Sequence, residues 1–142
     1  MKKNYNLPCN IAETLNIIGD KWTLLIIRDL LQGINKFSDL RESLSGIAPN
    51  VLSDRLRILE EEKIVETVQY SKHPPRFHYE LTRKGVELKH VLNTIAIWGN
   101  SHLEQKYYEV IDRDCGHEVE IAYYCPVCEK LSSTVTYKNV VK

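Results

Sequence analysis

Three cysteines and one histidine near the end of this 142-residue chain have the types and spacing of metal ligands. Cys115 and His117 make a C-x-H pair, and Cys125 and Cys128 make a C-x-x-C pair. Zinc takes four such ligands in a tetrahedron, and the C-x-x-C spacing lets two thiolates reach one ion. We therefore expect a structural Zn²⁺ at these four residues, in a small zinc-ribbon-like tail.

Two alternatives for these thiols stay open, a reversible Cys125–Cys128 disulfide and a set of inert thiols. A catalytic zinc is not expected, because four protein ligands leave no position for water or substrate. The zinc deaminase pattern is not matched either, since Glu118 follows His117 directly and Pro126 lies inside the C-x-x-C pair. The chain is not expected to be an enzyme.

A second group of polar residues falls on one face of a helix that Pro49 is expected to begin and that runs to about Lys63. Pro suits the first helical position, and a stripe of leucines marks the opposite, buried face. Asn and Arg on such a face match base edges in the DNA major groove, although an ordinary solvated face would have the same composition. The polar residues of this face are Asn50, Ser53, Asp54 and Arg57.

The neighbouring charges on this helix have more than one interpretation. Asp54 should repel phosphate, so it would either accept from a cytosine amino group or restrain Arg57 or Arg55. Arg55 lies nearer the core side of the helix, which favours a phosphate contact or an internal salt bridge.

A third group lies in the loop from Ser71 to Arg76, which contains two consecutive prolines. The β-branched and aromatic residues on both sides predict two strands and therefore a hairpin with a stiff tip. Lys72, His73 and Arg76 at this tip would contact phosphates or enter the minor groove. The alternative is an exposed turn with ordinary charges.

The formal net charge of the chain is zero, which argues weakly against nucleic-acid binding. The charges are nevertheless segregated along the sequence. Residues 67–79 contain no acid, whereas residues 60–66 contain Glu60, Glu61, Glu62 and Glu66 against the single base Lys63. A basic segment of this kind can bind phosphate locally while the total charge cancels.

The elements that must position these groups follow from periodicity and turn residues. Apolar residues at helical spacing predict four helices before the hairpin and one long helix after it. We expect Gly19, Gly33 and Gly46 to end helices, and Asp20, Ser38 and Thr82 to cap them. Alternating residues at 119–123 and 134–138 predict strands in the tail. The fold class is therefore mostly α (α+β), a winged helix-turn-helix at 1–104 with a β tail at 105–142.

The long helix after Thr82 carries more apolar surface than a small domain can bury. We expect part of this surface to pack on a second copy of the chain. Its apolar residues include Leu88, Val91, Leu92, Ile95, Ile97 and Trp98.

These features together resemble the MarR-like HxlR-type helix-turn-helix regulators. The resemblance is carried by CNIAETLNIIGDKWTLLIIRDLLQGINKFSDLRESLSGIAPNVLSDRLRILEEEKIVE, then PPRFHYELTRKG, then AIWG. It implies a homodimer whose first and last domain helices form the interface, a recognition helix at 49–63 and a wing at 70–77. Ala48 stands where the family usually has Ser or Thr, which removes a side-chain cap worth about 1 kcal/mol.

The resemblance also concerns Cys9, which matches an early cysteine that acts as a redox sensor in some family members. Here the sequence is Pro8-Cys9-Asn10, whereas the family often has Cys-Pro. A helix N-terminus favours the thiolate, and therefore reactivity, at this position. The alternative is a half-buried cysteine with no sensing role.

From these observations we expect a cytoplasmic homodimer that binds double-stranded DNA sequence-specifically and controls transcription, with repression favoured over activation and with a redox or small-molecule effector. The first residues contain no apolar stretch that would serve as a secretory signal, and no membrane partner is expected. The alternative function is a protein-interaction module that uses the winged helix and a zinc-bearing tail to dock.

Overall fold

The structure is a computed structural model that describes residues 4–141. Residues 1–3, which belong to the stretch considered for a secretory signal, lie outside the described residues. The chain divides into two compact units, Met1–Leu92 and Asn93–Lys142. The predicted domains, residues 1–104 and 105–142, stay a prediction. No helix within residues 4–141 is both long and apolar enough to span a membrane.

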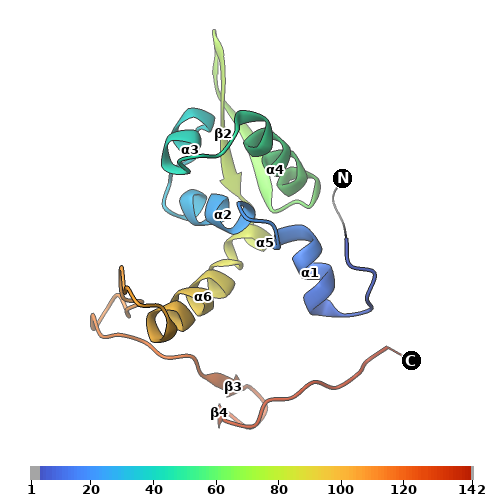
Figure 1. Ribbon diagram of the computed structural model, residues 1–142, viewed down its shortest axis with the longest axis vertical. Coiled ribbons are helices and arrows are strands. Elements are labelled where there is room, and N and C mark those ends of the chain that lie inside the picture. Colours follow the sequence, from blue (N-terminus) through green and yellow to red (C-terminus); the bar gives the residue numbers. More distant parts are fainter. Residues whose placement is uncertain (1–3, 142) are drawn as a thin grey trace. The chain divides into compact units, whose positions relative to one another are not determined.

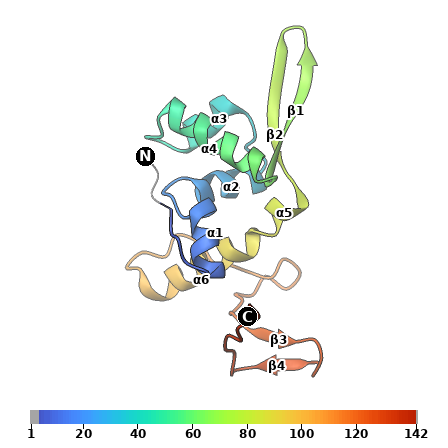
Figure 2. The ribbon, with the colours of Figure 1, turned by 90° about the vertical axis from the view of Figure 1, so that its right-hand side faces the viewer.

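The first unit is a helix-turn-helix followed by a long β hairpin (Figures 1 and 2). This arrangement confirms the predicted winged helix. Its elements are α1 (Asn10–Ile18), α2 (Thr23–Leu31), α3 (Phe37–Ser43), α4 (Pro49–Glu61), β1 (Val65–Lys72), β2 (Pro75–Leu81) and α5 (Arg83–Val86), with α6 (Lys89–His102) beginning at its end.

The core of this unit lies where α2, α3, α4 and the start of β1 meet. The predicted leucine stripe of α4 is confirmed, since these leucines are at most 2% exposed. Burial of such side chains stabilises the unit by about 1.5–3 kcal/mol each. The core residues are Ile26, Ile27, Leu30, Leu40, Leu44, Ile47, Leu52, Leu56, Leu59, Ile64 and Val65.

The turns of the helix-turn-helix follow the local sequence. Gly33 and Gly46 have φ values of 87° and 94°, a region that residues with a Cβ rarely adopt. Pro49 begins α4, as predicted. Asp20 caps the start of α2, because its Oδ1 accepts from the backbone N–H groups of Trp22 and Thr23 at 2.9 and 3.1 Å.

Two predicted caps differ from the structure. Ser38 lies inside α3, because Leu40 N–H already donates to Lys36 O at 2.9 Å and Lys36 is the capping residue. Thr82 caps the short α5 rather than the long helix, and its Oγ1 accepts from Gly85 N–H at 3.2 Å. The same hydroxyl donates to Lys63 O at 2.6 Å, which ties the end of the wing to the end of α4.

The wing is the antiparallel hairpin β1–β2, with Val65 opposite Leu81 at its base and Lys72 opposite Pro75 at its tip. The register shifts between Gln69 and Ser71, which marks a bulge near the tip. Tyr79 N–H donates to Asn35 O at 2.9 Å, so the hairpin is also bonded to the segment between α2 and α3.

The second unit contains the remainder of α6 and a short antiparallel pair, β3 (Tyr123–Cys125) and β4 (Lys130–Ser132). The predicted strand at 134–138 is wrong, because residues 133–141 form no strand in the structure. At 119–123 only Tyr123 belongs to a strand. A single bridge joins Ile111 and Glu118. An alternating sequence forms a strand only where a second strand can pair with it. Here the pairing occurs between the residues on either side of the C-x-x-C turn.

Candidate DNA-binding surface

The exposed face of α4 carries the polar residues that the sequence singled out. Asn50, Ser53 and Arg57 are exposed, and Asp54 is partly exposed. Figure 2 shows α4 beside the base of the β1–β2 hairpin within the first unit. The face therefore offers amide, hydroxyl, guanidinium and carboxylate groups to a ligand on the outside of the helix-turn-helix.

Arg57 is held on this face by two carboxylates of its own helix. Its Nη2 donates to Asp54 Oδ1 at 2.7 Å and its Nη1 donates to Glu61 Oε1 at 2.6 Å. The hydrogen bond to Asp54 contributes most to raising the pKa of Arg57, followed by that to Glu61. The sequence suggested Asp54 as a restraint but missed Glu61, although Glu61 lies at the i+4 position where such pairs form.

Arg55 points toward the body of the unit. The sequence left open whether it contacts phosphate or forms an internal salt bridge, and in the structure it forms the salt bridge. Its Nε lies 3.3 Å from Asp20 Oδ1 and its Nη1 lies 3.7 Å from Asp54 Oδ2. Only 19% of the Arg55 side chain is exposed. The pair joins α4 to the segment that precedes α2.

Asp20 is thus both a helix cap and the partner of Arg55. Burial raises the pKa of Asp20, but a hydrogen bond from the Thr23 hydroxyl, the backbone N–H groups of Trp22 and Thr23, and the Arg55 charge outweigh this effect. The net result is a lowered pKa, so the carboxylate stays ionised. The sequence identified the cap but gave no signal for a salt bridge between residues so far apart along the chain.

The tip of the wing carries cations that face solvent. Lys72, His73 and Arg76 are all exposed, and none of them makes an ion pair within residues 4–141. Ser71 Oγ donates to Pro74 O at 3.0 Å, which closes the turn locally. The tip therefore presents uncompensated positive charge on an ordered hairpin.

The wing is also held by side-chain interactions that sequence reasoning missed. Lys36 Nζ lies 5.2 Å from the centroid of the Tyr70 ring, which stacks on His78 at 5.6 Å. His78 Nε2 in turn lies 2.8 Å from Glu80 Oε1. These interactions join the start of α3 to both wing strands, and Lys36 and Tyr70 are too far apart in sequence to be paired by spacing.

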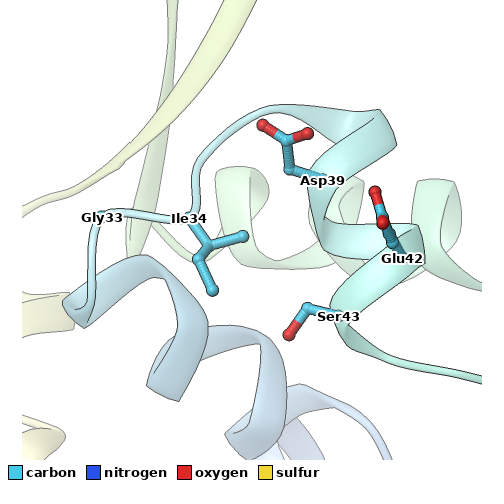
Figure 3. Close-up of a pocket in the computed structure, with 5 residues that line it drawn as sticks. All are labelled: Gly33, Ile34, Asp39, Glu42 and Ser43. Atoms are coloured by element: carbon cyan, nitrogen blue, oxygen red, sulfur yellow. The ribbon is translucent and has the colours of Figure 1, made fainter.

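Two shallow hollows lie on α3. Figure 3 shows the first, with Asp39, Glu42 and Ser43 of α3 facing Gly33 and Ile34. Its two carboxylates make it a poor site for phosphate. The second adjoins the turn before α4 and includes a cation and hydroxyls that the sequence analysis did not single out, with Ser38, Arg41, Glu42, Ser45, Gly46 and Ile47 as its lining.

All four thiols of the chain are free. Cys9 is exposed and occupies the position just before α1, and its carbonyl accepts from Glu13 N–H at 2.9 Å. In the tail, Cys128 N–H donates to Cys125 Sγ at 3.4 Å. Hydrogen bonds from the Cys128 and Val127 backbones lower the pKa of the Cys125 thiol. Within residues 4–141 no three His, Cys, Asp or Glu side chains are grouped so that they could hold a metal ion, so the structure does not bring the four predicted zinc ligands together.

Two helices carry large apolar side chains that the rest of residues 4–141 leaves exposed. On α1, Ile11 is 55% exposed and Leu15 is 42% exposed. On α6, Val91, Ile95 and Trp98 share one face and are 38%, 51% and 60% exposed. No residue of α6 is fully buried.

Comparison with known proteins places this architecture in a family. The model of the HxlR-like helix-turn-helix family matches residues 17–107. The HTH-type transcriptional regulator YtcD of Bacillus subtilis is 32% identical over 106 residues, covering 75% of this chain and 82% of YtcD. The crystal structure of PA1607, a candidate transcription factor, superposes with a TM-score of 0.77 at 29% identity and covers 94% of this chain and 97% of its own.

A further solved structure is the reduced form of the transcriptional regulator YodB from B. subtilis. It is 30% identical with a TM-score of 0.59, and the match covers 69% of this chain and 97% of YodB. The helix-turn-helix, the wing and the extent of these matches agree with one another. The chain is therefore a member of the HxlR-like helix-turn-helix family.

Proposed function

We propose that the chain regulates transcription in the cytoplasm by binding duplex DNA as a homodimer. In this proposal α4 enters the major groove and the β1–β2 wing touches the adjacent backbone. The observation that carries it is the exposed hydrogen-bonding face of α4 next to a wing tip whose cations have no ion-pair partner within residues 4–141. Relatives in the same family are transcriptional regulators rather than enzymes.

A neutral chain can bind DNA in this way because the groups that meet phosphate are locally positive. Arg57 is already charged and positioned on α4, and its two carboxylate partners are 46% and 62% exposed. Exposed ion pairs of this kind are weak. A guanine that offers O6 and N7 can therefore replace Asp54 and Glu61 as the acceptor for the Arg57 guanidinium.

The homodimer is supported by the uncovered apolar faces of α1 and α6. A soluble chain that leaves an isoleucine and a tryptophan half exposed on one helix face gains stability by covering them. A twofold dimer would present two α4 helices to half-sites about one helical turn of DNA apart. The operator is then expected to be a pseudopalindrome.

Replacing Arg57 with Ala tests the placement of α4. We expect affinity for the operator to fall about tenfold or more and the preference at one base pair in each half-site to relax, because alanine cannot make the bidentate hydrogen bond to a base. The measurement is an electrophoretic shift with DNA from the chain's own upstream region, compared with a scrambled sequence.

Arg83→Ala is the matched control, since Arg83 is an exposed arginine outside α4 and the wing. It should leave both affinity and preference unchanged. If the wild-type chain binds the upstream and scrambled sequences equally weakly across a salt series, the protein-interaction function is favoured instead. If Arg57→Ala binds as tightly as the wild type, the assignment of α4 as the reading helix is wrong.

We also propose that Cys9 makes DNA binding responsive to oxidants. The thiol is exposed at the start of α1, next to a helix that carries uncovered apolar residues. One structure similar to this chain is a reduced form of a regulator, YodB. A disulfide between two Cys9 side chains, or an adduct at Cys9, would alter the dimer that α1 is proposed to help form.

Treatment with diamide should therefore change the operator affinity of the wild-type protein and leave that of Cys9→Ser unchanged. The comparison uses the same electrophoretic shift before and after treatment, with dithiothreitol to reverse it. Equal responses from the two proteins would remove Cys9 from the mechanism, because Cys115 and Cys128 are also exposed.

A further inference from the structure

The C-x-x-C pair spans the end of β3 and the turn that leads into β4. Strands β3 and β4 pair in strict register, with Tyr123 opposite Ser132 and Cys125 opposite Lys130. Between them Cys128 N–H donates to Cys125 Sγ at 3.4 Å. Glu129, directly after Cys128, has a φ of 54°, which turns the chain back into β4. The two cysteines are therefore joined within one turn by an N–H···S hydrogen bond.

A second closed turn carries the other two candidate ligands. Asp112 Oδ1 accepts from the backbone N–H groups of Asp114 and Cys115 at 2.8 and 3.3 Å. Asp112 N–H donates to His117 O at 2.9 Å, and Gly116 has a φ of 74°. Cys115 and His117 therefore lie on one tight turn, residues 112–117. Both turns belong to the same compact unit.

Little apolar packing holds these two turns. From residue 103 to residue 141 no side chain is fully buried, and only Val110, Val119, Cys125 and Ser132 are partly buried. The large apolar side chains of β3, β4 and the turn between them, Tyr123, Tyr124, Val127 and Leu131, are 55–89% exposed. A segment this small and this poorly buried ordinarily needs a metal or a disulfide to hold its fold.

We propose that one Zn²⁺ joins the two turns, with Cys115, His117, Cys125 and Cys128 as its ligands. Three thiolates and one imidazole form a complete tetrahedral set for zinc, and they disfavour the harder ions calcium and magnesium. The structure has these residues on two separate turns and groups no three of them, so in this proposal the ion supplies the interaction that brings the turns together. Binding is then coupled to folding of the tail. The role is structural, because four protein ligands leave no open position.

The test uses the full-length protein, purified without chelator and with a reductant, and measures zinc by elemental analysis. We expect about one zinc per chain. The double variant Cys125→Ser/Cys128→Ser should lose it, and Cys115→Ser and His117→Ala should each lower the zinc content at least severalfold after dialysis. Cys9→Ser is the matched control, and it should keep the full zinc content because Cys9 lies in the other unit.

Two further measurements separate ligation from a general loss of structure. His117→Cys offers a thiolate in place of the imidazole and should retain the ion, whereas His117→Ala should not. Limited proteolysis should cut residues 105–141 rapidly after zinc is removed and slowly when zinc is restored, while the first unit stays protected.

Three outcomes would overturn the proposal. They are a wild-type protein that binds no zinc, a zinc content that Cys115→Ser and His117→Ala leave unchanged, and a Cys125–Cys128 disulfide in protein isolated without reductant. The first unit does not contain the four ligands. DNA binding by the zinc-free double variant can therefore be measured separately from its zinc content. Failure of the zinc site and failure of the proposed function are thus distinguishable.

Discussion

The Ile95→Asp protein is expected to sediment as a folded monomer under conditions in which the wild-type chain sediments as a dimer. Ile95 lies at the centre of the exposed α6 face and is 51% exposed in the single chain. A carboxylate there is solvated in the monomer but would be buried without a partner in the dimer, which costs several kcal/mol. The dissociation constant should rise by about three orders of magnitude or more.

Sedimentation across a concentration series measures this shift, and circular dichroism checks that the variant is folded. Asn93→Asp is the matched control, because Asn93 is exposed on the same helix and points nearly opposite to Ile95. It adds the same charge and should leave the dimer intact. A wild-type chain that is monomeric at micromolar concentration, or an Ile95→Asp protein that remains dimeric, would contradict the role of this face.

The prediction extends to DNA binding because each protomer supplies one α4. A folded Ile95→Asp monomer would retain one reading helix and one wing, and would bind a half-site without the gain from linking two sites. Its operator affinity should therefore fall toward that of the wild type for a single half-site.

Much of the first unit could be predicted from sequence because its signals are local. The leucine stripe of α4 follows a helical period, Pro49 marks its start, and Gly33 and Gly46 mark turns with positive φ. Each of these signals involves residues that are close together along the chain. The wing was equally accessible, since two β-branched stretches around a Pro-Pro loop allow few other arrangements.

The polar interactions behind the candidate DNA-binding surface could not be predicted in the same way. The Arg55–Asp20 pair and the Lys36–Tyr70 interaction join residues that are brought together only when α2, α3 and the wing pack. The sequence placed Arg55 near the core side but left its partner open. It also identified Arg57 without Glu61, because a helix face shows which groups are neighbours but not which pairs form.

In the tail, a local sequence signal was present but predicted the wrong strands. Alternation predicted strands at 119–123 and 134–138, yet the pairing occurs between Tyr123–Cys125 and Lys130–Ser132. The register of a hairpin is set by its turn, and here the turn is the C-x-x-C segment rather than the alternating residues. The alternating residues therefore did not predict which residues of the tail pair.

Removing both lysine and arginine from the wing tip should weaken binding to every DNA sequence. The double variant Lys72→Ala/Arg76→Ala takes two solvent-facing cations from each protomer, and neither makes an ion pair within residues 4–141. A dimer would then neutralise about four fewer phosphates, so affinity should fall by roughly a hundredfold at moderate salt. Binding should also become less salt-dependent, with a slope that is smaller by about 0.9 for each phosphate no longer neutralised.

Titrations of operator and scrambled DNA at several salt concentrations measure both effects. The control Arg83→Ala/Lys89→Ala removes two exposed cations outside α4 and the wing, and it should keep the wild-type slope. An unchanged slope in the wing variant would show that the tip does not touch phosphate. Because Arg57→Ala should affect the operator much more than scrambled DNA, and the wing variant should affect both alike, the two results together separate base reading by α4 from backbone binding by the wing.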